Sequence, residues 1–280
     1  MRIPRFWRRF DGDVRKPDGG QVHVSAWGWS ESSEGDADES ARERFREMQR
    51  QVSQGLELPR GYDYGSRPVR EQILREIQGR DGEVDALLTR NAYGSVVLNA
   101  ARAMFIDVDA PPARRASAFG QVFGRGGGST DAALDQIRRA VSSASLGSVR
   151  VYRTAAGFRL LATDREFAPS SSEAESTMRA VGADPSFVQL CKVQDSFRAR
   201  LTPKPWRVGQ SAPPRDFPRE ETWQQKAFDE WLRDYERAAA SSATCRFVET
   251  IGGTFVHSGV APVLALHDEQ TKAASGLPLA

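Results

Sequence analysis

Two aspartates separated by one valine, Asp107 and Asp109, form the pattern in this chain that is most capable of chemistry. On a strand, residues two positions apart point to the same face, so both carboxylates should lie side by side. Neighbouring carboxylates repel one another and resist ionisation unless a cation lies between them. We therefore expect the pair to hold Mg²⁺ or Mn²⁺, which take oxygen ligands and bridge to phosphate. The alternative is that Asp109 only initiates a turn at the end of the strand.

A second pattern combines basic and aromatic side chains between positions 197 and 207. Positive charge beside aromatic faces suits the binding of phosphate together with the stacking of bases. The alternative is a loop whose arginines pair with nearby acidic residues while Trp206 covers the core. The residues concerned are Phe197, Arg198, Arg200, Lys204, Trp206 and Arg207.

Other site patterns in the sequence are weak. The stretch Gly124–Gly128 could cradle phosphate with backbone N–H groups at the start of a helix, or serve only as an exposed connection. It lacks the Gly-Lys-Ser/Thr of a P-loop. Two cysteines, Cys191 and Cys245, are too few for a disulfide framework or a four-thiolate zinc site. The absence of a Gly-x-Ser-x-Gly motif argues against a serine hydrolase of that type.

The two aspartates end an apolar run, 103–108, that predicts a buried strand terminated by Pro111 and Pro112. A helix at about 131–144 follows, with Ser129 or Thr130 as its expected cap. Alternating residues at 148–154 and 157–163 then predict the two arms of a hairpin. A strand-helix-strand connection places strands 103–108 and 149–154 in one sheet. This βαββ order is the core of ferredoxin-like and polymerase-palm sheets.

The flanking sequence predicts further elements around this core. A charged surface helix at about 37–54 and the helix at about 219–240 each carry an apolar stripe. The second stripe contains Trp223, Phe228, Trp231 and Tyr235, which we interpret as core packing. The remaining expected elements are a strand at 21–27, a helix at 68–78, two short strands around a turn within 87–99, helices at 172–182 and 184–194, a basic loop at 198–207, a strand at 245–251 and an element at 260–267.

The predicted fold class is α+β, with a palm/RRM-like βαββ sheet core, an N-terminal extension and C-terminal helices. We expect residues 1–280 to form a single domain. Within it, 1–85 would be the N-terminal extension, 86–207 the palm-like core, and 208–280 a C-terminal helix and strand elaboration.

This centre resembles the palm of the archaeo-eukaryotic primase (primase-polymerase) superfamily over about 103–207. The family's first motif, an apolar strand ending in Asp-x-Asp, is matched by Phe105–Asp109. Its third motif, an acid before a basic segment, is matched by Asp195 and the residues that follow it. The resemblance implies metal-dependent nucleotidyl transfer, with Asp107, Asp109 and Asp195 as catalytic residues. It also implies a nucleotide or nucleic acid as partner, with phosphate bound by Arg159, Arg198, Arg200 and Lys204.

The family's second motif differs in this chain. Where the family carries a histidine in the hairpin, this sequence has Arg159. An arginine can clamp a triphosphate but cannot act as a titrating imidazole. Three other stretches are similar to a bacterial family of uncharacterised proteins, which implies a bacterial origin and no particular activity. They are Thr89–Gly94, Tyr152–Gly157 and Phe197–Trp206.

Composition indicates a folded protein, because 39% of the residues are hydrophobic and 27% are charged. The 39 basic residues outnumber the 37 acidic ones by two, and nearly all are arginine. This bias suits a phosphate or nucleic-acid partner, and a general preference for arginine in alanine- and glycine-rich sequences explains it as well. An apolar stretch of about 18 residues is missing, which argues against a membrane-spanning protein. Without an apolar run near Met1, we expect no signal peptide and a cytoplasmic location.

Three functions remain open from the sequence. The first is a nucleotide- or nucleic-acid-handling protein, such as a metal-dependent nucleotidyltransferase that uses Asp107 and Asp109. The second is a non-catalytic module that binds nucleic acid or a protein, which Arg159 favours. The third is a metal-dependent transferase in which the same acids hold a sugar nucleotide. The sequence carries no indication of the oligomeric state.

Overall fold

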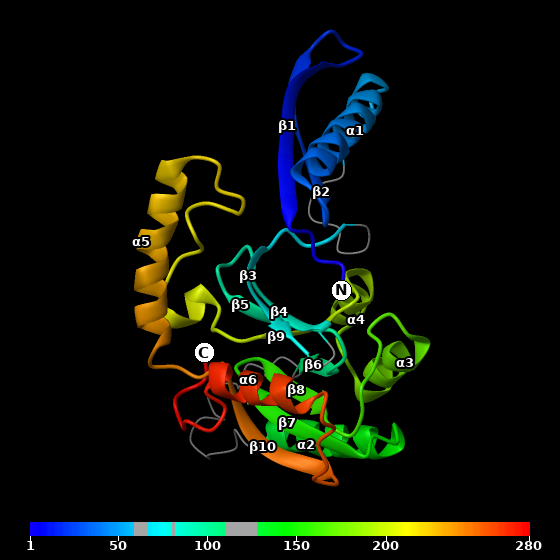
Figure 1. Ribbon diagram of the computed structural model, residues 1–280, viewed down its shortest axis with the longest axis vertical. Helices are drawn as coiled ribbons and strands as arrows, with labels where there is room; N and C mark the ends of the chain where they lie inside the picture. The colour runs from blue at the N-terminus through cyan, green and yellow to red at the C-terminus, as the bar shows by residue number, and fades with distance from the viewer. Residues whose placement is uncertain (59–66, 80–81, 110–127) are drawn as a thin grey trace, which may run out of the picture.

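The computed structural model describes residues 1–58, 67–79, 82–109 and 128–280, except the side chains of 128–130. This part of the chain forms six α-helices and three antiparallel sheets, which confirms the mixed α+β class. A two-stranded unit lies at one end of the long axis and a four-stranded sheet at the other, with a second four-stranded sheet between them (Figure 1). Most of the expected loop Gly124–Gly128 lies outside the described residues.

The N-terminal unit is a hairpin of β1 (Phe6–Arg15) and β2 (Gln21–Ser30), crossed by α1 (Glu34–Ser53). Strand β1 was not predicted, and α1 begins earlier than expected. Its start is set by Ser33, whose side chain accepts a hydrogen bond from the backbone N–H of Asp36. The unit has its own apolar cluster, which consists of Val14, Val24, Ala26, Phe45 and Val52.

The middle sheet has the strand order β3-β4-β5-β9, with every neighbouring pair antiparallel. Its strands are β3 (Gln72–Gln78), β4 (Val84–Arg90), β5 (Val96–Ala100) and β9 (Phe197–Arg200). The turn between β4 and β5 is as predicted. There, the side chain of Asn91 accepts hydrogen bonds from Tyr93 and Ser95, and Gly94 has a φ of 85°.

The helix predicted at 68–78 is wrong, because Gln72–Gln78 is the edge strand β3. The β-branched side chains of Ile73 and Ile77 favour a strand, and pairing with β4 satisfies backbone groups that β4 would otherwise leave open. The basic loop expected at 198–207 is also partly regular. It contains the end of β9 and the short 3-10 helix η2 (Pro205–Val208).

The second four-stranded sheet carries the predicted βαββ unit. Its order is β10-β7-β8-β6, and its strands are β6 (Phe105–Asp109), β7 (Ser148–Thr154), β8 (Gly157–Ala162) and β10 (Cys245–Gly252). Strand β8 lies between β6 and β7 and is antiparallel to both, so β6 and β7 run parallel. Their expected place in one sheet is confirmed. The helix between them, α2 (Gly128–Ser143), begins before Ser129 and Thr130, which therefore lie in its first turn instead of capping it.

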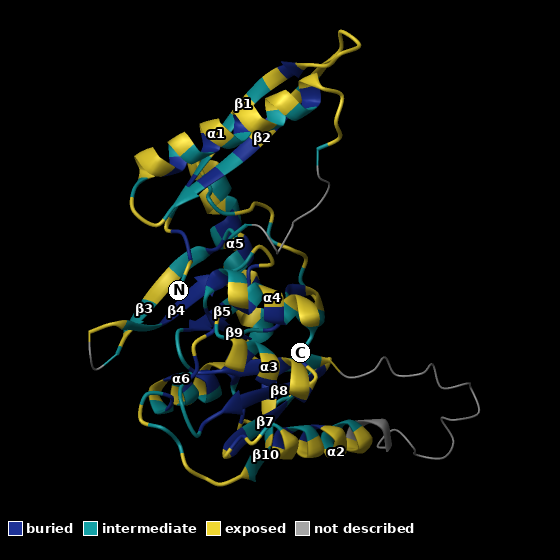
Figure 2. Ribbon diagram, turned by 90° about the vertical axis from the view of Figure 1, so that its right-hand side faces the viewer, coloured by how far each residue is buried: buried dark blue, intermediate teal, exposed yellow. Residues whose placement is uncertain are grey.

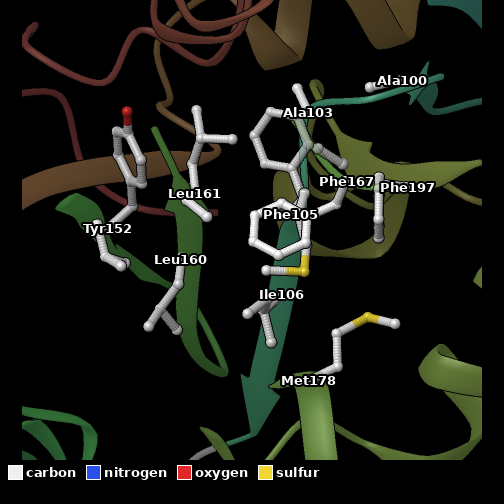
Figure 3. Packing of buried hydrophobic residues seen from close by; sticks show 14 of the residues in the cluster. Ala100, Ala103, Phe105, Ile106, Tyr152, Leu160, Leu161, Phe167, Met178 and Phe197 are labelled. Carbon is white, nitrogen blue, oxygen red and sulfur yellow. The ribbon is translucent and has the colours of Figure 1, made fainter. Parts of the chain in front are cut away.

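The main hydrophobic core fills the space between the two four-stranded sheets and under the surrounding helices. Phe105 and Ile106 from β6 lie close to Leu160 of β8, Phe197 of β9 and Met178 (Figure 3). The remaining core helices are α3 (Ser172–Val181), α4 (Pro185–Gln194) and α6 (Ala261–Thr271). Buried positions concentrate in the strands of these sheets, whereas the N-terminal unit is largely exposed (Figure 2).

Helix α5 (Thr222–Ala239) packs through a separate cluster beside η2. Phe228, Trp231 and Tyr235 are buried there, as the aromatic stripe predicted. Trp223 belongs to the predicted stripe but is 55% exposed, because it lies in the first turn of the helix beyond the cluster. None of the described helices combines the length and apolar character that a bilayer crossing requires.

Candidate functional site

Strand pairing places Arg159 of β8 directly opposite Asp107 of β6. The Arg159 Nε–H donates to Oδ1 of Asp107 at 2.8 Å, and its Nη2–H donates to Oδ2 at 3.3 Å. The Arg159 side chain is 1% exposed, while that of Asp107 is 39% exposed. Burial opposes the charge on Arg159, but the adjacent carboxylate outweighs it, and the pKa of Arg159 is raised. The two residues therefore form a fixed, neutral pair.

The same guanidinium connects the two four-stranded sheets. Its Nη1–H donates to the backbone carbonyl of Arg200 at 2.8 Å, and Arg200 ends strand β9. Strands β6 and β9 are in contact although they belong to different sheets. The side chains of Arg200 and Asp107 are thus brought together by three strands that lie far apart in the sequence.

A cavity of about 220 Å³ lies beside this junction. We call it the cationic cavity, because its basic lining residues outnumber the acidic ones. The basic residues that line it are Arg159, Arg200, Lys204 and Arg207. The acidic residues are Asp107, Asp109 and Asp184.

Two guanidinium groups in this cavity carry unsatisfied donors. The Nε of Arg200 and the Nη1 of Arg207 are buried and have no hydrogen-bond partner among the described residues. Burial, together with the nearby charges of Arg159 and Arg207, lowers the pKa of Arg200 to about 10. Burial and the charge of Arg200 also lower the pKa of Lys204. Buried donors require an acceptor, and these cations would be stabilised by an anion between them.

The other two acidic residues of the cavity differ in their hydrogen bonds. Asp109 is exposed, and its carboxylate contacts no donor in the described part of the chain. Asp184 caps α4, because its Oδ1 accepts a hydrogen bond from the backbone N–H of Phe187 at 2.9 Å. Sequence reasoning did not propose Asp184, although an Asp before a proline at a helix start indicates such a cap.

The donor set does not fit a divalent ion held by the protein alone. Both oxygens of Asp107 accept hydrogen bonds from Arg159, so of the expected pair Asp109 is the carboxylate without a donor among the described residues. Within the described ranges, no three His, Cys, Asp or Glu side chains gather in a group that could hold a metal.

Two predicted site residues lie away from the cationic cavity. Asp195 ends α4 in the left-handed conformation, with a φ of 49°, and its carboxylate lies 3.7 Å from the N-terminal ammonium. Arg198 precedes Arg200 by two residues on β9, but its guanidinium is buried against Glu71, at 2.6 Å. It also donates to Asn99 at 2.7 Å. Arg198 thus matches the alternative interpretation, in which arginines of this segment pair with acidic residues.

The geometry brings together five of the seven predicted residues: Asp107, Asp109, Arg159, Arg200 and Lys204. It adds Arg207, which belongs to the basic segment recognised in the sequence but was not assigned to the site. Its position three residues after Lys204, in the same basic segment, could have indicated it.

Comparison with known proteins gave no match, whether to protein-family models, to curated proteins or to solved structures. The function is therefore inferred from the site itself.

Proposed function

We propose that this protein binds the phosphate of a nucleotide or of a nucleic acid in the cationic cavity. The observation that carries the proposal is the pair of buried donors on Arg200 and Arg207 that have no partner among the described residues. A phosphate oxygen accepts charge-assisted hydrogen bonds from guanidinium groups, often two at once. One phosphate between these side chains would satisfy both donors and offset the burial and the neighbouring positive charges that together lower the pKa of Arg200.

The Asp107–Arg159 pair is neutral, and this favours the binding of an anion in the cavity. Because Arg159 compensates the charge of Asp107, the acidic residues left to face the three remaining basic side chains, within the described part of the chain, are Asp109 and the helix-capping Asp184. A cavity of this sign attracts an anion. Arg159 itself would position Arg200 through the bond to its carbonyl, and would contact the ligand little, since its donors are engaged.

Kinship with the primase-polymerase palm remains part of this proposal. It is supported by the βαββ unit whose first strand presents Asp107 and Asp109 to the cavity. A second candidate function, metal-dependent nucleotidyl transfer, is favoured by Asp109, whose free carboxylate faces the same cavity as the phosphate-binding side chains. In that case the phosphates of the substrate would have to supply most of the ligands of the metal.

The first experiment measures the melting temperature of the protein with increasing inorganic pyrophosphate or ATP. Stabilisation should grow with the logarithm of ligand concentration above its dissociation constant. Arg200→Gln and Arg207→Gln should each weaken binding by about tenfold or more. Lys226→Gln is the matched control, because Lys226 is an exposed cation on α5. Equal stabilisation of the native protein and both arginine variants would refute the proposal.

A second series separates binding from catalysis. ATP is titrated with excess EDTA, with Mg²⁺ and with Mn²⁺, for the native protein and for Asp109→Asn. Stabilisation that is unchanged by EDTA favours a binding module. Stabilisation that needs the metal and is lost in Asp109→Asn favours nucleotidyl transfer, and justifies an assay for primer extension. A response to a sugar nucleotide but not to ATP would favour the third hypothesis from the sequence.

A further inference from the structure

Two exposed aromatic side chains, Tyr93 and Trp206, lie against each other on the surface. Their ring centroids are 5.3 Å apart and their planes are nearly perpendicular, at 82°. Tyr93 is 43% exposed and Trp206 is 51% exposed. Tyr93 belongs to the β4–β5 turn and Trp206 to η2, so the pair is formed by the fold and not by sequence proximity. Large exposed aromatic side chains that gather on a surface often mark a binding site.

Trp206 does not itself line the cationic cavity, but it lies close in sequence to residues that do. Its neighbours in η2 and at the helix start, Arg207 and Lys204, both line that cavity. The Lys204 Nζ lies 5.3 Å from the centre of the Trp206 ring. The exposed ring of Trp206 is thus adjacent to Lys204, one of the proposed phosphate-binding residues.

Tyr93 lines a second, larger cavity of about 550 Å³. We call it the upper cavity; it lies between β2, the middle sheet and the segment before α5. Among the described residues of its wall, arginines outnumber acids by six to two. The arginines are Arg67, Arg70, Arg90, Arg198, Arg215 and Arg219. The acids, Glu71 and Asp216, are paired with Arg198 and Arg70.

The upper cavity also contains flat surfaces of the kind on which bases stack. The guanidinium of Arg219 lies 3.7 Å from the ring centre of Phe228, and that of Arg70 lies 4.1 Å from Trp27. Bases stack on aromatic rings and on arginine planes. Burial lowers the pKa of Arg219 and of Arg90, so an anion in this cavity would find partly desolvated cations.

We propose that one single strand of nucleic acid crosses this surface, from the cationic cavity over Trp206 and Tyr93 into the upper cavity. This inference rests on the proposed function and extends it. Phosphates would be held by Arg200, Lys204 and Arg207, and unstacked bases would contact the two exposed rings. A mononucleotide would fill one cavity only. A duplex would keep its bases stacked inside the helix, beyond the reach of these side chains.

The test uses fluorescence anisotropy with a labelled single-stranded oligonucleotide of about 12 nucleotides. The same probe as a duplex and a labelled mononucleotide serve as comparisons. The native protein should bind the single strand most tightly. The double variant Tyr93→Ala/Trp206→Ala should weaken it by about 30-fold or more, since it removes two surfaces on which bases stack. Phe255→Ala is the matched control, because Phe255 is 63% exposed and lines neither cavity.

Melting temperatures with pyrophosphate, measured on the same variants, separate the two proposals. The double variant should respond to pyrophosphate like the native protein, which also shows that it is folded. If single strand, duplex and mononucleotide bind equally, or if the double variant binds the strand normally, the strand path is wrong while phosphate binding stands. If neither pyrophosphate nor the oligonucleotide binds, both proposals fail. DNA and RNA probes are run in parallel, and tight binding of either supports the path.

Discussion

Arg159 holds both carboxylate oxygens of Asp107 from a position 52 residues away in the sequence. The pairing follows from the register of β6 and β8, which places the two residues directly opposite each other. The two carboxylates of the Asp-x-Asp motif therefore differ. Asp107 neutralises a buried cation, and the carboxylate of Asp109 contacts no donor among the described residues.

Replacing Asp107 by Asn should destabilise the protein by about 2–3 kcal/mol. The change leaves the guanidinium of Arg159 buried without a counter-charge, which is the costly half of breaking a buried ion pair. Because Asp107 is partly exposed, we expect a smaller loss than the roughly 3–5 kcal/mol that breaking a fully buried ion pair costs. Urea unfolding measures the change in free energy. Asp109→Asn is the control and should change stability by no more than about 0.5 kcal/mol; equal losses in both variants would show that the pair does not matter.

Replacing Arg198 by Lys should lower stability by about 2–4 kcal/mol and leave phosphate binding in the cationic cavity unchanged. A lysine cannot span Glu71 and Asn99 together as the guanidinium does. Urea unfolding gives the first quantity, and the pyrophosphate titration gives the second. A stable variant that no longer binds pyrophosphate would instead support the sequence-based assignment of Arg198 as a phosphate ligand.

Stability should fall as the pH is lowered from about 6.5 to 4, in part because of His267. Burial lowers its pKa to about 4, and the groups that face it are Asp268, Tyr152, Cys245 and Arg159. In this window the unfolded chain binds a proton that the folded protein excludes, so stability rises with pH. The loss amounts to at most about 3 kcal/mol.

The measurement is the melting temperature of the native protein and of His267→Gln across this range. Carboxylates titrate there as well, so the informative quantity is the difference between the two proteins. That difference should shrink or change sign as the pH falls, because only the native chain carries the histidine. A difference that stays constant from pH 7 to 4 would mean that His267 does not titrate as argued.

Replacing Gly28 by Ala should destabilise the N-terminal unit by about 1–3 kcal/mol. A Cβ at this position would overlap the backbone of Ala37 and Ala41, so α1 would have to move away from β2. Gly35→Ala is the matched control within α1, where the nearest atom to a new Cβ is the Ser33 Oγ at 3.8 Å. It should be neutral or stabilising by about 0.5–1 kcal/mol. Thermal unfolding of both variants provides the comparison.

The centre of the fold was predictable because its local signals agree. The apolar run before Asp107, the turn residues Asn91 and Gly94, and the alternation within 148–154 each indicate one structure. The same holds for the aromatic stripe of α5, apart from Trp223 at its end.

Other features of the structure depend on partners distant in the sequence. Residues 72–78 become a strand only because β4 offers an edge to pair with. Arg198 and Arg200 lie two residues apart on β9 but have different surroundings. Arg198 forms an ion pair with Glu71, whereas Arg200 lines the cationic cavity. Asp195 caps the end of α4, and its carboxylate lies near the N-terminal ammonium and does not line the cationic cavity. None of these contacts can be predicted from the spacing of the residues in the sequence.

The hydrogen bond from Arg159 to the carbonyl of Arg200 has a consequence for affinity. It fastens the β6–β8 wall of the cationic cavity to the β9 wall, so the two sheets cannot drift apart there without losing it. A binding site whose walls are fixed beforehand spends little of its interaction energy on ordering itself when a ligand arrives. Under the proposed function, the cavity would thus be preorganised by a side chain that need not touch the ligand.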